Sequence, residues 1–174
     1  AHGASQVMLD GEELVAGSMG DLGCFSFFPS KNMAVGGEGG MLTTTVSELT
    51  DAVSLVVNHG RSPSLESMQL GSNLRMSEVS AAIGTVQLSH LDSWVKRRIE
   101  IAETYHQSFA KHAHLTTPKV RPGAKHAWHQ YCLSTEYPDE LVAHLDKYSI
   151  DARRYYVTPC HRQNVFSKHP QHEE

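Results

Sequence analysis

Lys31 is the residue of this chain that is best placed to do chemistry. It follows an apolar, aromatic run, Cys24–Phe28, and the intervening Pro29. The run is too short for a helix and predicts a buried strand, which Pro29 ends because it has no N–H to donate to a sheet. A lysine at such a strand end is expected to be partly desolvated. Desolvation lowers the pKa of an amine and makes it a nucleophile that forms Schiff bases with carbonyl compounds.

Ser26 and a glycine-rich stretch flank this lysine. Ser26 offers a short hydroxyl that can bind a phosphate oxygen. After Lys31 the chain has four glycines among residues 36–40, and a second short strand is expected over 41–44. An amine and a hydroxyl on a turn between two strands are compatible with pyridoxal phosphate, whose aldehyde forms Schiff bases with lysine. From spacing alone, a solvated loop lysine beside an ordinary glycine turn stays an open alternative.

Other kinds of chemistry find little support. The chain has 12 histidines, but no carboxylate or cysteine set completes a metal shell at usual spacing, so no metal site is predicted. Its 3 cysteines are far apart in the sequence, which predicts a reducing, cytoplasmic setting and, for Cys24, a core position. The glycines form neither a dinucleotide fingerprint nor a P-loop.

Composition excludes further classes. The net charge of −4 gives no reason to expect nucleic acid or an anionic membrane as a partner. No apolar run approaches the ~18–20 residues of a membrane span, and the first residues lack the basic head and apolar core of a signal peptide. A chain of 174 residues can form one domain, or one domain and part of a second.

The pattern of apolar residues predicts the elements that position Lys31. A hairpin turn is expected at Asp10-Gly11, and a strand at about 128–135. A capping box, with Thr45 as N-cap, predicts a helix over 46–57, and a stripe containing Val79, Ile83 and Val86 predicts one over 77–90. Two more helices are expected over 91–111, with Lys96, Arg97 and Arg98 on its solvated face, and over 138–147.

Several segments, in order, resemble the DegT/DnrJ/EryC1/StrS family of pyridoxal-phosphate-dependent sugar aminotransferases. The resemblance extends over most of residues 1–110 and returns more weakly at 126–163. The segments that carry it are AHGA (1–4), GSMGDLGCFSFFPSKN (17–32), GGEGGMLTT (36–44), NHGR (58–61), LGSNLRMSEVSAAIGTVQL (70–88), RRIEIAETY (97–105) and DARRYYVTPCHRQ (151–163).

The resemblance implies an α/β fold, that of the fold-type-I, aspartate aminotransferase-like transferases, present in part. Residues 1–92 would be the C-terminal part of the large cofactor-binding domain. Residues 93–174 would be a long connecting helix and part of the small domain. The family's aspartate that pairs with the pyridinium nitrogen lies upstream of the segment matching AHGA, and is therefore expected outside this chain.

The resemblance also assigns roles. Lys31 would hold the cofactor as a Schiff base and move protons, while Ser26 would bind its phosphate. Asn73 would reach the phosphate of the other subunit in a homodimer, and Tyr156 and His161 would approach the substrate. The implied reaction transfers an amino group from an amino acid donor to a keto sugar, normally nucleotide-linked.

Two alternatives stay open. Dehydratases of the same superfamily have histidine in place of the Schiff-base lysine, so Lys31 argues against them. A non-catalytic remnant that serves only in assembly is favoured by the cofactor residues expected outside the chain. For that reason the 174-residue piece alone is expected to be inactive or poorly folded, unless another chain supplies the missing part.

Overall fold

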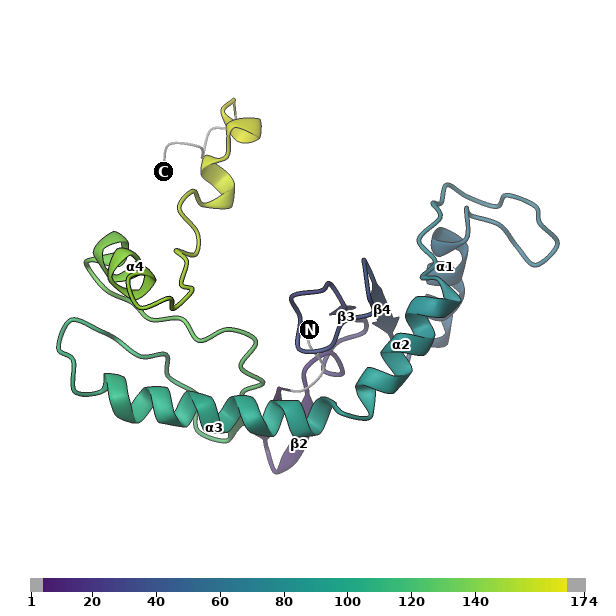
Figure 1. The fold of residues 1–174 in the computed structure, drawn as a ribbon. Coiled ribbons are helices and arrows are strands. Elements are labelled where there is room, and N and C mark those ends of the chain that lie inside the picture. Colours follow the sequence, from purple (N-terminus) through teal and green to yellow (C-terminus); the bar gives the residue numbers. More distant parts are fainter. Residues whose placement is uncertain (1–4, 169–174) are drawn as a thin grey trace.

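The structure, a computed structural model, describes residues 5–168, so the AHGA motif and residues 169–174 lie outside it. The helices are α1 (Ser47–Val57), α2 (Glu78–Leu88), α3 (Leu91–Phe109) and α4 (Pro138–Asp146), followed by the short η1 (Cys160–Arg162) and η2 (Asn164–Phe166). The strands are β1 (Gln6–Leu9), β2 (Glu12–Val15), β3 (Gly23–Ser26), β4 (Gly40–Thr43) and β5 (Ala124–Lys125). These elements form an open, curved arrangement with α1 and α4 at opposite ends and the strands between them (Figure 1).

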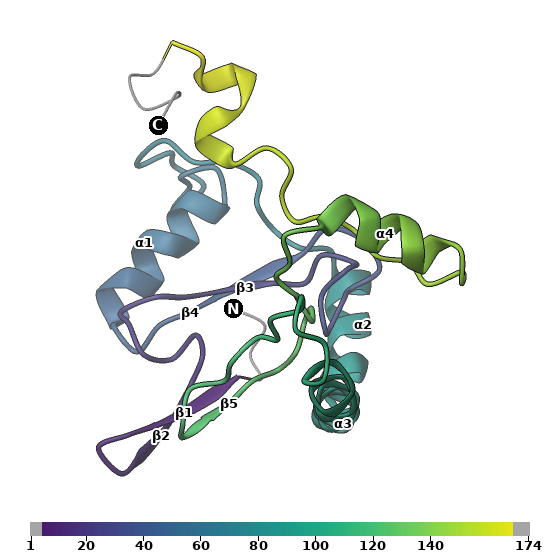
Figure 2. The ribbon, with the colours of Figure 1, turned by 90° about the vertical axis from the view of Figure 1, so that its left-hand side faces the viewer.

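The strands form two small antiparallel sheets in the part of the chain described. One has the order β2-β1-β5, and its hairpin turns at Asp10 and Gly11, whose φ angles of 51° and 87° suit a tight turn and confirm the prediction. The other pairs β3 with β4, from Gly23 opposite Thr43 to Ser26 opposite Gly40. It lies between α1 and α2 in Figure 2. Both strands predicted around Lys31 are present, but β3 ends at Ser26 and not at Pro29, and Phe28 is exposed.

A small apolar core lies behind the segment that joins β3 to β4. Its buried members come from that segment, from the start of α3 and from one distant residue: Phe27, Met33, Val35, Leu91, Val95 and Ala127. Phe25, Met76 and Ile99 pack against them. The segment carrying Lys31 is thus fixed on one side by apolar burial, the main stabilising contribution in folding.

We expect Val35→Ala to lower the free energy of unfolding by about 2 kcal/mol, because Val35 is fully buried and its lost methyl groups leave a cavity. Chemical denaturation checks this value. The matched control is Val79→Ala on α2, where the side chain is 73% exposed and the change should stay within about 0.5 kcal/mol. Equal effects of the two substitutions would contradict this description of the core.

Helix α2 does not bury the stripe predicted for it. Val79, Ile83 and Val86 are all exposed, and Gly84 is the buried residue of the helix. A Cβ placed on Gly84 would lie 3.1 Å from the side chain of Val35. Helix α2 therefore contacts the core through Gly84, its smallest residue, and its apolar side chains remain exposed.

Three local predictions are also wrong. Thr45 is not a cap: Val46 is the N-cap of α1, and its N–H donates to the hydroxyl of Thr44 at 3.0 Å. Cys24 is exposed because successive strand residues face opposite sides, and it is its neighbour Phe25 that packs on the core. Residues 128–135 form no regular strand; the segment has one isolated bridge, between Thr116 and Ser134.

Candidate active site around Lys31

Lys31 lies on a closed turn directly after β3. The N–H of Phe27 donates to the carbonyl of Gly39 at 2.8 Å, which holds the two ends of the segment together. The N–H of Lys31 donates to the carbonyl of Phe28 at 2.9 Å, which closes a tight turn through Pro29. The lysine is half-buried, as its position after an apolar strand led us to expect. Its backbone is therefore held in place, and its side chain is partly shielded from solvent.

Ser26 is the last residue of β3 and belongs to the same hairpin. It is half-buried and pairs with Gly40. Its hydroxyl oxygen accepts a long hydrogen bond, 3.5 Å, from the N–H of Phe28. Its O–H has no recorded acceptor among residues 5–168 and is free to donate to an anion. The structure thus brings Ser26 and Lys31 onto one hairpin, through the loop that follows the strand.

A distant segment, residues 127–129, holds both neighbours of Lys31 in the sequence. The side-chain amide of Asn32 donates to the carbonyl of Ala127 at 2.8 Å. On the other side, the Nε2 of His129 lies 3.0 Å from the carbonyl of Ser30 and donates to it. Arg98 of α3 donates in turn to the carbonyls of Trp128 and His129 at 3.0 and 3.3 Å. Arg98 is therefore not part of a solvated face as predicted.

The surroundings of His129 lower its pKa. Burial of the ring is the main cause, and the positive charges of Lys31 and Arg98 act in the same direction, whereas the hydrogen bond to Ser30 opposes them. The site therefore combines an amine and a histidine that favours its neutral form.

This shift predicts a pH dependence of stability. A histidine whose folded pKa lies below its unfolded value, about 6.5, binds more protons when unfolded. Its stabilisation is fully present above pH 6.5 and is lost as the pH falls through the folded pKa. We expect the unfolding free energy of the His129→Gln variant to fall less between pH 7 and pH 5 than that of the parent chain. Parallel slopes would contradict the shift.

Asn73 lies on a different segment, which folds back on the end of α1. It forms an isolated bridge with Asn58, and its side-chain oxygen accepts from the Nε of Arg75 at 3.1 Å. Asn73 is exposed. In residues 5–168 no recorded hydrogen bond or ion pair joins it to Lys31 or Ser26, so the structure of this single chain leaves its cofactor contact untested.

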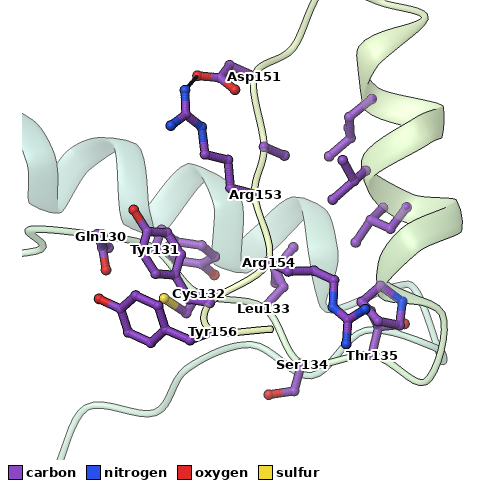
Figure 3. Close-up of a pocket in the computed structure, with 16 residues that line it drawn as sticks. Gln130, Tyr131, Cys132, Leu133, Ser134, Thr135, Asp151, Arg153, Arg154 and Tyr156 are labelled. Atoms are coloured by element: carbon purple, nitrogen blue, oxygen red, sulfur yellow. Dashed lines mark ion pairs between the residues drawn. The ribbon is translucent and has the colours of Figure 1, made fainter. Parts of the chain in front are cut away.

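Tyr156 and His161, the predicted substrate residues, lie in the C-terminal segment. Tyr156 is 76% exposed and lies at the edge of a cavity of about 710 Å³, beside Tyr131 and Cys132 (Figure 3). His161 is exposed within η1. Neither residue has a recorded hydrogen bond or ion pair with Lys31 in the described chain. The cavity is bordered by Arg154, which binds both carboxylate oxygens of Asp139 at 3.0 Å.

Sequence reasoning missed the residues that hold the turn. Asn32 adjoins the lysine in the sequence, and its type, a polar residue before a buried apolar stretch, was the available signal. His129 is one of the 12 histidines, and nothing in its local sequence distinguishes it. Its contact with Ser30 joins residues 99 positions apart, and no local pattern reveals such a pair.

A family model described as the DegT/DnrJ/EryC1/StrS aminotransferase family matches residues 1–174. The chain belongs to this family. The resemblance stated from the motifs is confirmed, and pyridoxal phosphate is the cofactor of this aminotransferase family.

Curated relatives and solved structures agree with the assignment. The chain is 37% identical over 153 residues to a pleiotropic regulatory protein of Geobacillus stearothermophilus, covering 87% of this chain and 41% of the relative. It is 35% identical over 167 residues to dTDP-3-amino-3,4,6-trideoxy-alpha-D-glucose transaminase of Streptomyces venezuelae, covering 96% and 43%. The crystal structure of DesV from S. venezuelae, in complex with a ketimine intermediate, matches with a TM-score of 0.87 and 30% identity, covering 95% and 43%.

These matches decide the fold. The chain has the α/β fold of these aminotransferases in part, because it spans less than half of each of these relatives and of the solved structure. No helix among residues 5–168 is long and apolar enough to cross a membrane.

Proposed function

We propose that this chain carries the lysine of a pyridoxal-phosphate-dependent aminotransferase that moves an amino group from an amino acid to a keto sugar, normally nucleotide-linked. The observation that carries the proposal is Lys31 itself, a half-buried amine on a turn closed by backbone hydrogen bonds. The sugar substrate is supported by relatives named as sugar transaminases, among them a UDP-N-acetyl-3-dehydro-alpha-D-glucosamine 3-aminotransferase of Acidithiobacillus ferrooxidans, which is 34% identical.

The residues present fit the cofactor. A primary amine and a hydroxyl that is free to donate lie on one hairpin, and they match the two groups by which pyridoxal phosphate is bound, its aldehyde and its phosphate. When bound, the cofactor supplies an electron sink that stabilises negative charge on a substrate carbon. Lys31 would hold it through Nζ, and Ser26 would hold its phosphate.

Each protein group has a definite task in this proposal. With a substrate amine bound in place of Lys31, the Nζ of Lys31 would accept a proton from the substrate carbon as general base and then donate that proton to the carbon that becomes protonated, as general acid. The closed turn limits how far this amine can move, which is how positioned groups accelerate proton transfer. Tyr156 and His161 are proposed to approach the sugar, and this role remains a prediction.

Assembly and organisation are also part of the proposal. We propose a homodimer in which the exposed amide of Asn73 reaches the phosphate site of the second subunit. Residues 1–92 would close the large domain, and residues 93–174, beginning just inside α3, would lead into the small one. A cytoplasmic location remains a prediction.

The test is an amino-transfer assay with pyridoxal phosphate, glutamate and a panel of nucleotide-linked keto sugars. We expect release of 2-oxoglutarate that depends on the keto sugar, from the 174-residue chain when it is combined with the segments that complete its relatives. Release that does not depend on any keto sugar would contradict the substrate class. A complete protein without any amino transfer would favour a role in assembly alone.

A further inference from the structure

Lys31 is held from both sides by one short segment, residues 127–129, about a hundred positions further along the chain. Asn32 donates to Ala127, and Ser30 accepts from His129, so the residues immediately before and after Lys31 are both bound. These two hydrogen bonds measure 2.8 and 3.0 Å, which is ordinary hydrogen-bond geometry. The turn therefore has little freedom to rotate the lysine side chain away.

The segment that makes these bonds is itself fixed. Ala127 is 3% exposed and belongs to the same core as Phe27 and Val35. Its N–H donates to the hydroxyl of Ser5 at 3.1 Å. Arg98 holds the next two carbonyls from α3. Because residues 127–129 are themselves fixed, their hydrogen bonds also fix the turn that carries Lys31.

The side chain of Asn32 is buried with one of its polar atoms unpaired. The residue is 5% exposed, and its side-chain oxygen has no hydrogen-bond partner among residues 5–168. The amide cannot be turned around to satisfy this oxygen, because the carbonyl of Ala127 requires a donor and fixes the NH₂ toward it. A buried unpaired acceptor is destabilising, so the burial of this amide has to be explained by something other than stability.

We infer that Asn32 and His129 are positioning residues for Lys31, which they hold in the orientation that amino transfer requires. The inference rests on the proposed function, since it assigns a purpose to the direction of the lysine. Neither residue needs to touch the substrate. His129 acts through the carbonyl of Ser30, and Asn32 acts through the carbonyl of Ala127.

Three variants test the inference. His129→Leu removes the donor to Ser30, whereas His129→Gln keeps an N–H donor near the position of Nε2. Asn32→Asp replaces the donor to Ala127 by an acceptor that the carbonyl repels. His129 is only half-buried, so its replacement should leave the fold intact, which circular dichroism verifies.

The first readout needs no cofactor. Apo protein is treated briefly with acetic anhydride, and mass spectrometry gives the labelling rate of Lys31 relative to Lys96, an exposed lysine of α3. We expect the ratio to rise about 3-fold or more in His129→Leu and Asn32→Asp, because a loosened turn exposes the amine, and to return toward the parent value in His129→Gln.

The second readout is steady-state kinetics of amino transfer. There kcat should fall about 10-fold in His129→Leu with little change in the KM of the donor.

An unchanged labelling ratio and an unchanged kcat in both His129→Leu and Asn32→Asp would overturn the inference. A failure of the proposed function looks different, because the parent protein itself would then show no amino transfer that depends on Lys31, whatever the labelling ratios are. The inference would also be overturned if His129→Leu lost activity, His129→Gln did not restore it, and the labelling ratio of Lys31 to Lys96 stayed unchanged. That result would mean that His129 has a role other than positioning.

Discussion

Replacing Lys31 by alanine is expected to reduce amino transfer by at least about 10³-fold, the largest effect that we predict for any single substitution. The methyl group can neither attack an aldehyde nor carry a proton. Lys31→Arg should fail nearly as completely, because a guanidinium keeps the charge but does not give up its proton. Activity is measured as keto acid formed from the amino donor.

The matched control is Lys96→Ala, which removes an exposed lysine of α3 and should leave the rate unchanged. Lys31 is half-buried but not part of the apolar core, so the melting temperature of Lys31→Ala should stay close to that of the parent. Residual activity above about a tenth of the parent rate would contradict the role of Lys31, because proton transfer alone contributes more than that.

Gly60→Ala is expected to have the largest effect on stability, about 3 kcal/mol or more. Gly60 is buried with a φ of 71°, and a Cβ would lie 1.8 Å from the carbonyl oxygen of Gln69. Neither the backbone conformation nor the contact can be kept. The segment would separate from α1, and Asn73 would lose its bridge to Asn58. Thermal unfolding should show a melting temperature lower by about 6–12 °C.

Substitutions at two other glycines distinguish the effect of the positive φ from that of the close contact with Gln69. Gly11→Ala shares the positive φ, 87°, but meets no atom within 4 Å, and should cost about 1 kcal/mol. Gly37→Ala has neither problem and should be close to neutral. If Gly60→Ala were no worse than Gly11→Ala, the close contact with Gln69 would be absent from the folded protein.

The hairpin around Lys31 was predictable because its signals are local. An aromatic run, a proline and a glycine-rich stretch each constrain the few residues around them, and the strands begin and end within two residues of their expected places. Helix α4 begins at Pro138 for the same kind of reason, since proline suits the first turn of a helix. The family could be recognised because its motifs surround this same lysine.

Features that depend on distant partners could not be predicted. The exposure of Val79 and the burial of Gly84 depend on where Val35 lies, and periodicity alone does not contain that information. The N-cap of α1 moved because the hydroxyl of Thr44, which also donates to the carbonyl of Asp21, accepts the N–H of Val46. The contacts of Asn32 and His129 with the turn join segments on either side of α3, so only the folded arrangement reveals them.

The most direct test is reduction with borohydride in the presence of pyridoxal phosphate, followed by digestion and mass spectrometry of the peptides. Borohydride makes the bond between a lysine and this cofactor permanent. We predict a single major site of modification at Lys31, which is lost in Lys31→Ala and unaffected by Lys96→Ala. Modification spread over exposed lysines, or concentrated on a lysine other than Lys31, would contradict it.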